Sequence, residues 1–169
     1  MAILTRQEIL KELKKGRIKI TPLKVKNIGP CSVDLTLGDK FRKFKRVRGV
    51  HDVDKTADYT KITRSIEAGS VVIRPGETIL GITREKITLP ANICGWLEGR
   101  SSIARLGLMV HISASLMQPG IDNHQVLEMT NLGSVPLRLH AGVSICQFIF
   151  EKTIGKARYT GRFSRQTKP

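Results

Sequence analysis

Apolar residues recur at two different spacings along the chain, and the change between them marks its organisation. Near the N-terminus, Ile9 and Leu13 follow Thr5-Arg6-Gln7-Glu8, which has the capping-box pattern of Thr at the N-cap and Glu three residues later. Residues four apart lie on one face of a helix. The pattern therefore predicts one helix over about residues 6–15, ending near Gly16.

Beyond Gly16, short stretches of alternating or continuous apolar residues replace the helical spacing. Turn-forming pairs, such as Pro75-Gly76 and Pro119-Gly120, separate them. Many short strands with one clear helix are typical of a β-sandwich, barrel or jelly roll. The stretches with strand character are 18–20, 33–37, 71–73, 78–83, 87–90, 93–97, 108–112, 126–129, 135–139 and 143–150.

Two segments between these strands have a different composition. Residues 40–48 hold six basic side chains interleaved with Phe41, Phe44 and Val47, which predicts a solvated edge strand or loop. Residues 51–69 are polar and weakly periodic, which predicts a loop with a strand fragment.

The chain shows no internal repeat, and its pattern predicts a single domain over residues 1–151. Residues 152–169 carry six basic and no acidic side chains. Such a tail is expected to be mobile on its own and able to order over a polyanion.

The composition of the chain limits the classes of molecule that it is expected to bind. The formal net charge of +15 favours a polyanion, but aromatic residues make up only 5% of the chain, so bases of a nucleic acid would find few stacking platforms. A nucleotide phosphate is therefore preferred to nucleic acid. The chain has no run of 18 apolar residues and no signal-peptide core, and its three cysteines form no paired motif. These features predict a cytoplasmic protein with no membrane contact.

The segment Gly99–Gly107 is the first candidate for chemistry. Arg100 and Arg105 flank the pair Ser101-Ser102, and the apolar spacing that follows predicts a short helix. A helix start offers unpaired N–H groups, and arginine forks bind phosphate, so the segment forms a candidate anion site. A solvated basic turn is the alternative.

Glu128 is the second candidate, because a carboxylate stands in an apolar strand. Strand alternation puts it on one face with Val126 and Thr130, and puts Leu127 and Met129 on the other. A buried Glu128 face would raise the pKa of the carboxyl and suit a proton shuttle. An exposed face would leave only a solvated strand residue.

Other chemistries find little support. The chain lacks the paired cysteines of a zinc nucleoside deaminase, and its four histidines show no metal-ligand spacing. Each histidine is interpreted as a structural or a surface residue. No P-loop, dinucleotide-binding motif or serine-hydrolase motif occurs.

Seven motifs, taken in order, resemble the dCTP deaminase family of the trimeric dUTPase-like superfamily and span nearly the whole chain. They are Pro30–Gly38, Leu97–Gly107, His111–Ala114, Pro119-Gly120, Val126–Glu128, Ile145–Gln147 and Tyr159–Gln166.

This resemblance implies a mostly β, dUTPase-like jelly roll or distorted barrel, with a short N-terminal helix and a short helix near residues 101–106. It also implies a homotrimer with active sites between subunits. The implied substrate is dCTP or dUTP. Mg²⁺ would be bound through the substrate phosphates rather than a protein cage, and no zinc would be used.

The resemblance also implies roles for individual residues. Glu128 would activate the water that attacks C4, supported by Arg105 and Ser101 as catalytic residues, and Arg100, Ser101 and Ser102 would hold the triphosphate.

The backbone near residues 112–114 would read the pyrimidine edge, and the tail would close over the phosphates. The full set of implied substrate-binding residues is Arg100, Ser101, Ser102, Ile103, Ala104, Arg105, Ile112, Ser113, Ala114, Gln118, Val126, Leu127, Gln147, Tyr159, Arg162 and Gln166.

The chain departs from the family pattern in one stretch. Gln118 stands where the family usually has the aspartate that dUTPases use to activate water, and an amide cannot accept a proton as a carboxylate does. Asp122 is four residues too late to replace it, and Asn123 stands where glycine is usual. Glu128, which is associated with deamination, is kept.

Three hypotheses follow from these observations. The first is a dCTP deaminase that makes dUTP in pyrimidine deoxynucleotide metabolism, with or without onward hydrolysis to dUMP. The second is a dUTPase that releases diphosphate. The third is a binding module that has kept the fold without the chemistry. The kept glutamate and the lost aspartate favour the first.

Overall fold

A computed structural model describes residues 2–169, so residue 1 of the predicted domain lies outside the described part. In chain order its elements are β1 (Ala2–Ile3), α1 (Arg6–Lys14), β2 (Lys19–Thr21), η1 (Val25–Asn27), β3 (Ser32–Thr36), β4 (Lys40–Phe44), α2 (Tyr59–Ile62), β5 (Thr63–Glu67), β6 (Ser70–Ile73), β7 (Thr78–Thr88), β8 (Ile93–Gly99), α3 (Ser101–Ala104), β9 (Leu108–Val110), β10 (Leu116–Met117), β11 (Asp122–Asn131), β12 (Leu137–His140) and β13 (Ser144–Lys152).

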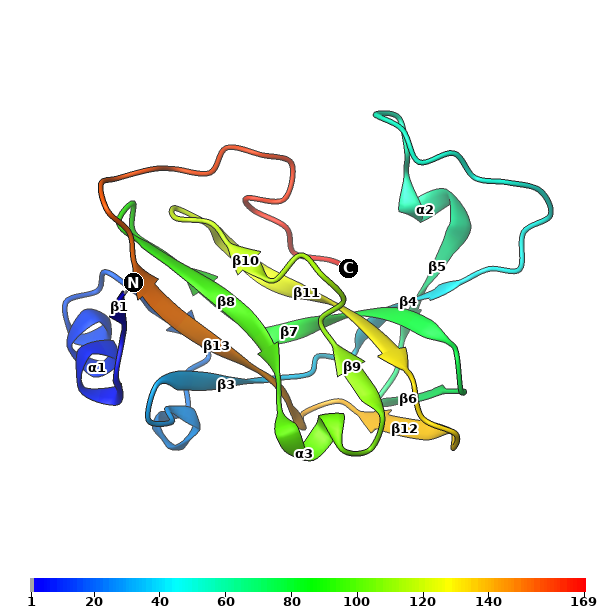
Figure 1. Ribbon diagram of the computed structural model, residues 1–169, viewed down its shortest axis with the longest axis horizontal. Coiled ribbons are helices and arrows are strands. Elements are labelled where there is room, and N and C mark those ends of the chain that lie inside the picture. The colour runs from blue at the N-terminus through cyan, green and yellow to red at the C-terminus, as the bar shows by residue number, and fades with distance from the viewer. Residues whose placement is uncertain (1) are drawn as a thin grey trace.

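The strands form two main sheets and one short two-stranded sheet (Figure 1). One sheet has the order β1-β13-β8-β10, with β3 also paired to β13, and the other has the order β5-β4-β7-β11-β9, with β2 also paired to β7. β6 pairs with β12. Apolar side chains from both sheets, among them Leu35, Phe148, Ile79 and Leu127, join one buried cluster. The prediction of a mostly β protein is confirmed.

The helix α1 lies where the spacing predicts it, and it buries Ile9 completely. Thr5 is the N-cap, but its side chain makes no capping hydrogen bond, so that part of the capping-box prediction is wrong. Helix α3 occupies Ser101–Ala104, inside the predicted segment. The short helix α2, by contrast, was not expected; it begins where the Asp58 side chain accepts a hydrogen bond from the Thr60 amide at 3.0 Å.

The prediction of a solvated edge strand or loop at residues 40–48 is corrected for its first half. β4 lies inside its sheet, paired on one side with β5 and on the other with β7, and residues beyond it form an exposed loop. Phe41 is 1% exposed, so its burial holds the strand between its neighbours despite the basic residues around it. The strand fragment expected within 51–69 is β5.

Gly95 of β8 packs directly against β13. A Cβ at this position would overlap the Phe148 ring of β13 and lie 2.8 Å from the carbonyl oxygen of Ile149. The Phe148 ring also packs against Phe150, with the ring centroids 4.7 Å apart. The absence of a side chain at Gly95 therefore allows this aromatic pair to fill the core.

We expect Gly95→Ala to lower the free energy of unfolding by about 3 kcal/mol or more, because the buried ring and the backbone cannot both move away. Urea denaturation followed by tryptophan fluorescence measures the change. Gly69→Ala is the matched control, because a Cβ there meets nothing within 4 Å. Equal stability of the two variants would contradict the packing argument.

Candidate functional site

Glu128 lies on β11, where buried and partly exposed side chains alternate without interruption. Leu127 and Met129 are 0% exposed and belong to the core. The Glu128 side chain points to the opposite face and is 31% exposed. Of the two alternatives left open by the sequence, neither full burial nor full exposure is correct, because this face borders a cavity.

The cavity has a volume of about 490 Å³ and lies over β11, with walls from the β4 and α2 region and from the tail. Its lining combines apolar and aromatic side chains with a few polar groups, as is usual for small-molecule sites. The lining residues are Phe44, Tyr59, Leu80, His111, Ala114, Leu116, Met117, Gln118, Ile121, Asn123, Val126, Glu128, Tyr159, Phe163 and Gln166.

His111, directly after β9, contacts Glu128 through its Nδ1 atom and one carboxylate oxygen. The imidazole is 4% exposed. Burial acts to lower the pKa of His111, but the hydrogen bond and the negative charge of Glu128 outweigh it, so the pKa is raised above its ordinary value of 6.5. Glu128 and His111 thus form a coupled acid–base pair at the cavity wall.

The C-terminal tail lies against the start of β11. The Asp122 amide donates to the Ser164 carbonyl at 3.1 Å, and the His124 amide donates to the Gln166 carbonyl at 3.2 Å. The Tyr159 amide donates to the Pro119 carbonyl at 2.9 Å. These contacts bring the predicted tail residues Tyr159 and Gln166 to the cavity, together with Phe163.

The residues predicted to hold phosphate lie elsewhere. Ser101 and Ser102 begin α3 and are exposed, as is Arg105 just after it. α3 precedes β9 whereas His111 follows it, so the two groups lie at opposite ends of that strand. Arg100 is engaged within the chain: it pairs with Asp34 at 3.0 Å and donates to the Ser144 carbonyl at 3.1 Å.

Some of the remaining predicted residues lie at one of these two places, and others lie at neither. Ala114, Gln118 and Val126 line the cavity with Glu128. Gln147 lies beside the α3 group, where its side chain donates to the Gly99 carbonyl at 3.2 Å. The other five do not line the cavity: Leu127 is in the core, Ile103 packs against the core, and Ala104, Ile112 and Ser113 are exposed.

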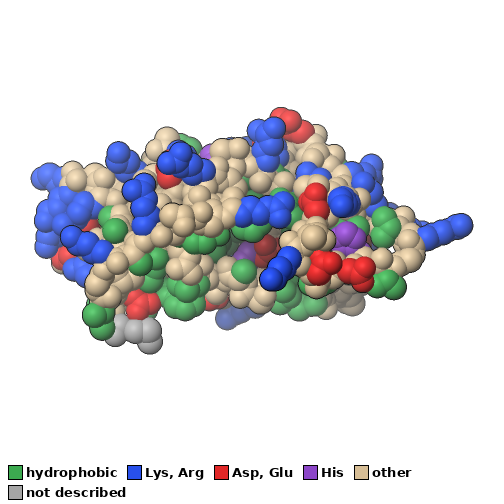
Figure 2. Space-filling model, turned by 90° about the horizontal axis from the view of Figure 1, so that it is seen from above, with side chains coloured by type: hydrophobic (Ala, Val, Ile, Leu, Met, Phe, Trp, Pro, Cys, Tyr) green, Lys and Arg blue, Asp and Glu red, His purple; other side chains and the backbone are tan. Residues whose placement is uncertain are grey.

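Arg162 also stays outside the cavity. Its guanidinium lies over the Phe163 ring at 5.5 Å from the centroid, and the side chain is exposed. No Lys or Arg is among the cavity-lining residues of the described chain. Figure 2 shows basic side chains gathered at the end of the molecule that carries α1, where Lys11, Lys14 and Lys15 are exposed. The Lys and Arg side chains thus lie outside the cavity lining in the described part of the chain.

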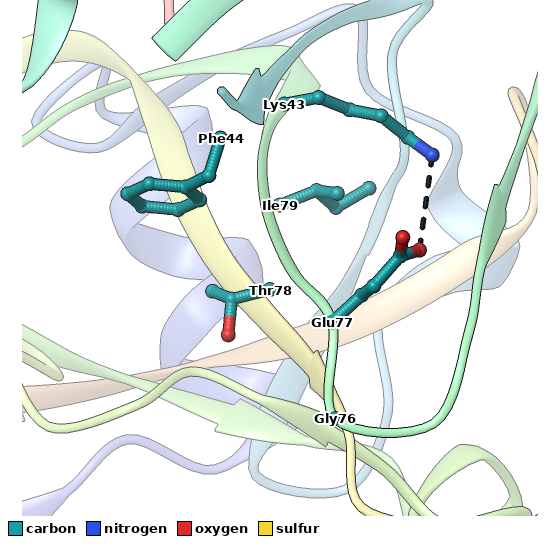
Figure 3. Close-up of a pocket in the computed structure, with 6 residues that line it drawn as sticks. All are labelled: Lys43, Phe44, Gly76, Glu77, Thr78 and Ile79. Atoms are coloured by element: carbon teal, nitrogen blue, oxygen red, sulfur yellow. Dashed lines mark ion pairs between the residues drawn. The ribbon is translucent and has the colours of Figure 1, made fainter. Parts of the chain in front are cut away.

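A second hollow, of about 420 Å³, lies at the turn before β7 (Figure 3). Lys43 and Glu77 face each other across it at 3.9 Å, and Phe44, Thr78 and Ile79 complete its wall. The positive charge of Lys43 is paired with the negative charge of Glu77, and the hollow contains none of the predicted site residues.

Asp122 has a structural environment that explains why it does not replace the aspartate missing at position 118. Lys86 and Thr88 donate hydrogen bonds to its carboxylate at 2.8 Å and 2.7 Å. These bonds, above all the one from Lys86, lower the pKa of Asp122. Gln118 lines the cavity and Asp122 does not.

Residues 2–169 contain no group of three or more His, Cys, Asp or Glu side chains that could hold a metal ion. No helix in the same part of the chain is long and apolar enough to cross a bilayer.

Comparison with known proteins decides the family. The family model described as dCTP deaminase-like matches residues 3–153. The chain belongs to the dCTP deaminase family. The match extends from the first strand through the last one, so it includes both the α3 group and the cavity residues on β11.

Several relatives cover nearly all of the chain. A protein of Methanosphaera stadtmanae named "dCTP deaminase, dUMP-forming" is 38% identical over 100% of this chain and 92% of its own length. A Nocardioides protein of the same name is 35% identical over 99% and 92%. A Marinomonas protein named "dCTP deaminase" is 40% identical over 89% and 84%.

Solved structures show the same fold. The 2'-deoxycytidine 5'-triphosphate deaminase of Agrobacterium tumefaciens has a TM-score of 0.68 at 20% identity, covering 88% of this chain and 46% of that one. A dUTPase of phage phi11 of S. aureus has a TM-score of 0.53 at 11% identity, covering 86% and 96%. The predicted dUTPase-like fold is confirmed.

Sequence reasoning missed several cavity residues of this dCTP deaminase family member. His111 was interpreted as structural because it has no ligand spacing, yet it contacts Glu128. Phe44 and Tyr59 come from the basic and weakly periodic segments and reach the cavity only through the sheet order. His111 directly follows β9, which pairs with the Glu128 strand, and no pattern within either segment reveals that pairing.

The raised pKa of His111 predicts a pH-dependent contribution to stability. A histidine whose pKa is raised on folding stabilises the fold fully below its ordinary pKa of 6.5, and this contribution is lost as pH rises through the raised value. Glu128→Gln removes the charge that raises it. The difference in free energy of unfolding between wild type and Glu128→Gln is therefore expected to be larger at about pH 5.5 than at about pH 8.5.

Urea denaturation of both proteins across this pH range measures the difference, so contributions from other groups cancel. A difference that is constant, or that grows with pH, would show that the pair is not coupled as described.

Proposed function

We propose that this member of the dCTP deaminase family hydrolyses dCTP to dUTP and ammonia, with Glu128 as the proton-transfer residue. The observation that carries the proposal is the position of Glu128: it lines a largely apolar cavity and is held by His111. A carboxylate in such a place is within reach of a bound base and partly shielded from water.

In the proposed reaction, the Glu128 carboxylate accepts a proton from a water molecule as the oxygen attacks C4 of the cytosine ring. Glu128 passes this proton to the ring nitrogen N3, then takes the second proton from the new C4 hydroxyl and passes it to the amino group. The C4–N bond breaks, and ammonia leaves as the C4 carbonyl forms. The His111 Nδ1–H holds the carboxylate in orientation, because it contacts one of its two oxygens. Ala114 and Gln118 lie where they could contact the base or sugar.

The triphosphate is proposed to bind to a neighbouring subunit. The cavity residues of the described chain include no Lys or Arg, whereas the exposed Ser101, Ser102 and Arg105 are removed from Glu128 by the length of β9. A homotrimer that juxtaposes α3 of one subunit with the cavity of the next would supply the missing cations. Arg162 of the tail would add to them.

We infer the main product from the residue at position 118. Relatives with the dUMP-forming name include the Methanosphaera and Nocardioides proteins. In this chain the amide of Gln118 lines the cavity, and Asp122 is tied to Lys86 and Thr88. We therefore propose dUTP as the main product, with onward hydrolysis to dUMP as the alternative.

Mg²⁺ is proposed to arrive on the triphosphate as part of the substrate, since the described residues offer it no ligand cluster. We place the reaction in the cytoplasm, in keeping with the free thiols of Cys31, Cys94 and Cys146.

Glu128→Gln is expected to lower the rate of ammonia release from dCTP by about a thousandfold or more, because the amide cannot accept the proton of the water. The assay incubates the protein with dCTP, dUTP or CTP and measures ammonia and diphosphate separately. Wild type should release ammonia faster than diphosphate. Rapid dUTP hydrolysis with no ammonia would select the dUTPase hypothesis, and tight binding without turnover would select the binding module.

Co-expression of Arg105→Ala and Glu128→Gln chains carrying different tags tests the site between subunits. If each site combines Glu128 of one subunit with Arg105 of the next, each mixed trimer regains one site in three, which is about a quarter of all sites after equal random mixing, although each variant alone is inactive. If both residues served within one chain, every chain would carry a defect and the mixture would stay inactive.

A further inference from the structure

Asn123 is a polar residue whose side-chain amide is buried. It lies on β11 between Asp122 and His124, and it is 3% exposed. A buried amide destabilises a fold unless its donors and acceptors are paired. The partners of Asn123 therefore indicate what it does.

Its side chain joins the tail to the strand. Asn123 Nδ2 donates to the backbone carbonyl of Phe163 at 2.6 Å, and Asn123 Oδ1 accepts from Gln125 Nε2 at 2.8 Å. Gln125 is itself 1% exposed, and its Nε2 atom also donates to the backbone carbonyl of Asn123 at 3.4 Å. Because Gln125 holds the oxygen of Asn123, the nitrogen is directed to the tail.

The contact lies in the middle of the tail pairing described above. The Asp122 and His124 amides donate to the Ser164 and Gln166 carbonyls on either side of it, and Gln166 Nε2 donates back to the His124 carbonyl at 3.2 Å. The tail thus meets β11 through three consecutive residues. Asn123 provides the side-chain contact of these three.

We propose that Asn123 is a positioning residue, whose amide holds the tail in the register that places Phe163 and Gln166 in the wall of the Glu128 cavity. The proposal rests on the proposed use of that cavity by dCTP. Asn123 itself borders the cavity, so its hydrogen bond to Phe163 closes the wall at the point where strand and tail meet.

The physical reason is that the donor is oriented before the tail docks. Gln125 Nε2 holds the Asn123 oxygen at 2.8 Å, so the Asn123 nitrogen already faces the side on which Phe163 lies, and its hydrogen bond to the tail costs little conformational entropy. Docking of the tail is favoured before substrate arrives, so the substrate has less of the tail to order when it binds.

Asn123→Asp tests the proposal, because aspartate has the same shape but no side-chain donor. In the absence of nucleotide, trypsin cleavage after Arg162 and Arg165 is expected to become about fivefold to tenfold faster than in wild type. Mass spectrometry separates these cuts from cuts elsewhere in the chain.

The matched control is Asn131→Asp at the other end of β11. Asn131 is equally buried, at 0% exposure, and its Nδ2 also donates to backbone carbonyls, those of Ile73 and Val135. This variant is expected to lose stability while cleavage of the tail keeps the wild-type rate. Faster tail cleavage in both variants would show general loosening and overturn the proposal.

Kinetics provide the second readout. Asn123→Asp is expected to raise the KM for dCTP about fivefold and to change kcat less than about twofold, because bound substrate restores tail docking. A variant that cleaves and reacts as wild type does would refute the role of Asn123 while leaving deamination by Glu128 intact. Failure of wild type to deaminate dCTP would instead refute the proposed function, and the trypsin result without nucleotide would stand.

Hydrogen exchange of the wild-type protein keeps the proposal testable if Asn123→Asp does not fold. The Asp122 and His124 amides should be protected, because the tail covers them. Exchange at the rate of free amides would mean that the tail is not docked, and would overturn the proposal.

Discussion

The alternation of side chains along β11 is the constraint on which the site depends. Leu127 and Met129 are completely buried, and this burial determines which face of the strand is turned to the core. Glu128 lies between them and must take the opposite face. A shift by one residue would place its carboxylate in the core and apolar side chains in the cavity. The packing of two aliphatic residues therefore positions the catalytic candidate.

Local patterns predicted the elements that local chemistry determines. The helix α1 follows from the apolar spacing of Ile9 and Leu13, and α3 from the apolar spacing of Ile103 and Leu106. The parity of Glu128 followed from strand alternation alone. The active-site roles expected of α3 and Glu128 came from the resemblance to the dCTP deaminase family, because spacing cannot show which chemistry a carboxylate performs.

What the sequence could not show depends on contacts between distant segments. His111 meets Glu128 because β9 pairs with β11, and no pattern within either segment reveals that pairing. The basic composition of residues 40–48 predicts an edge strand or loop, but the buried side chain of Phe41 holds β4 between β5 and β7. The role of Asn123 likewise depends on a distant segment, because its side chain donates a hydrogen bond to the carbonyl of Phe163, 40 residues later in the tail.

The tail also covers a strand edge that could otherwise pair with another copy of the chain. β9 pairs only with the last three residues of β11, from Met129 to Asn131. Without the tail, the Asp122 and His124 amides would form an open strand edge, the kind of surface that recruits strands from other chains and begins aggregation. The segment that completes the cavity wall is therefore also the cover that keeps this edge from pairing with the wrong chain.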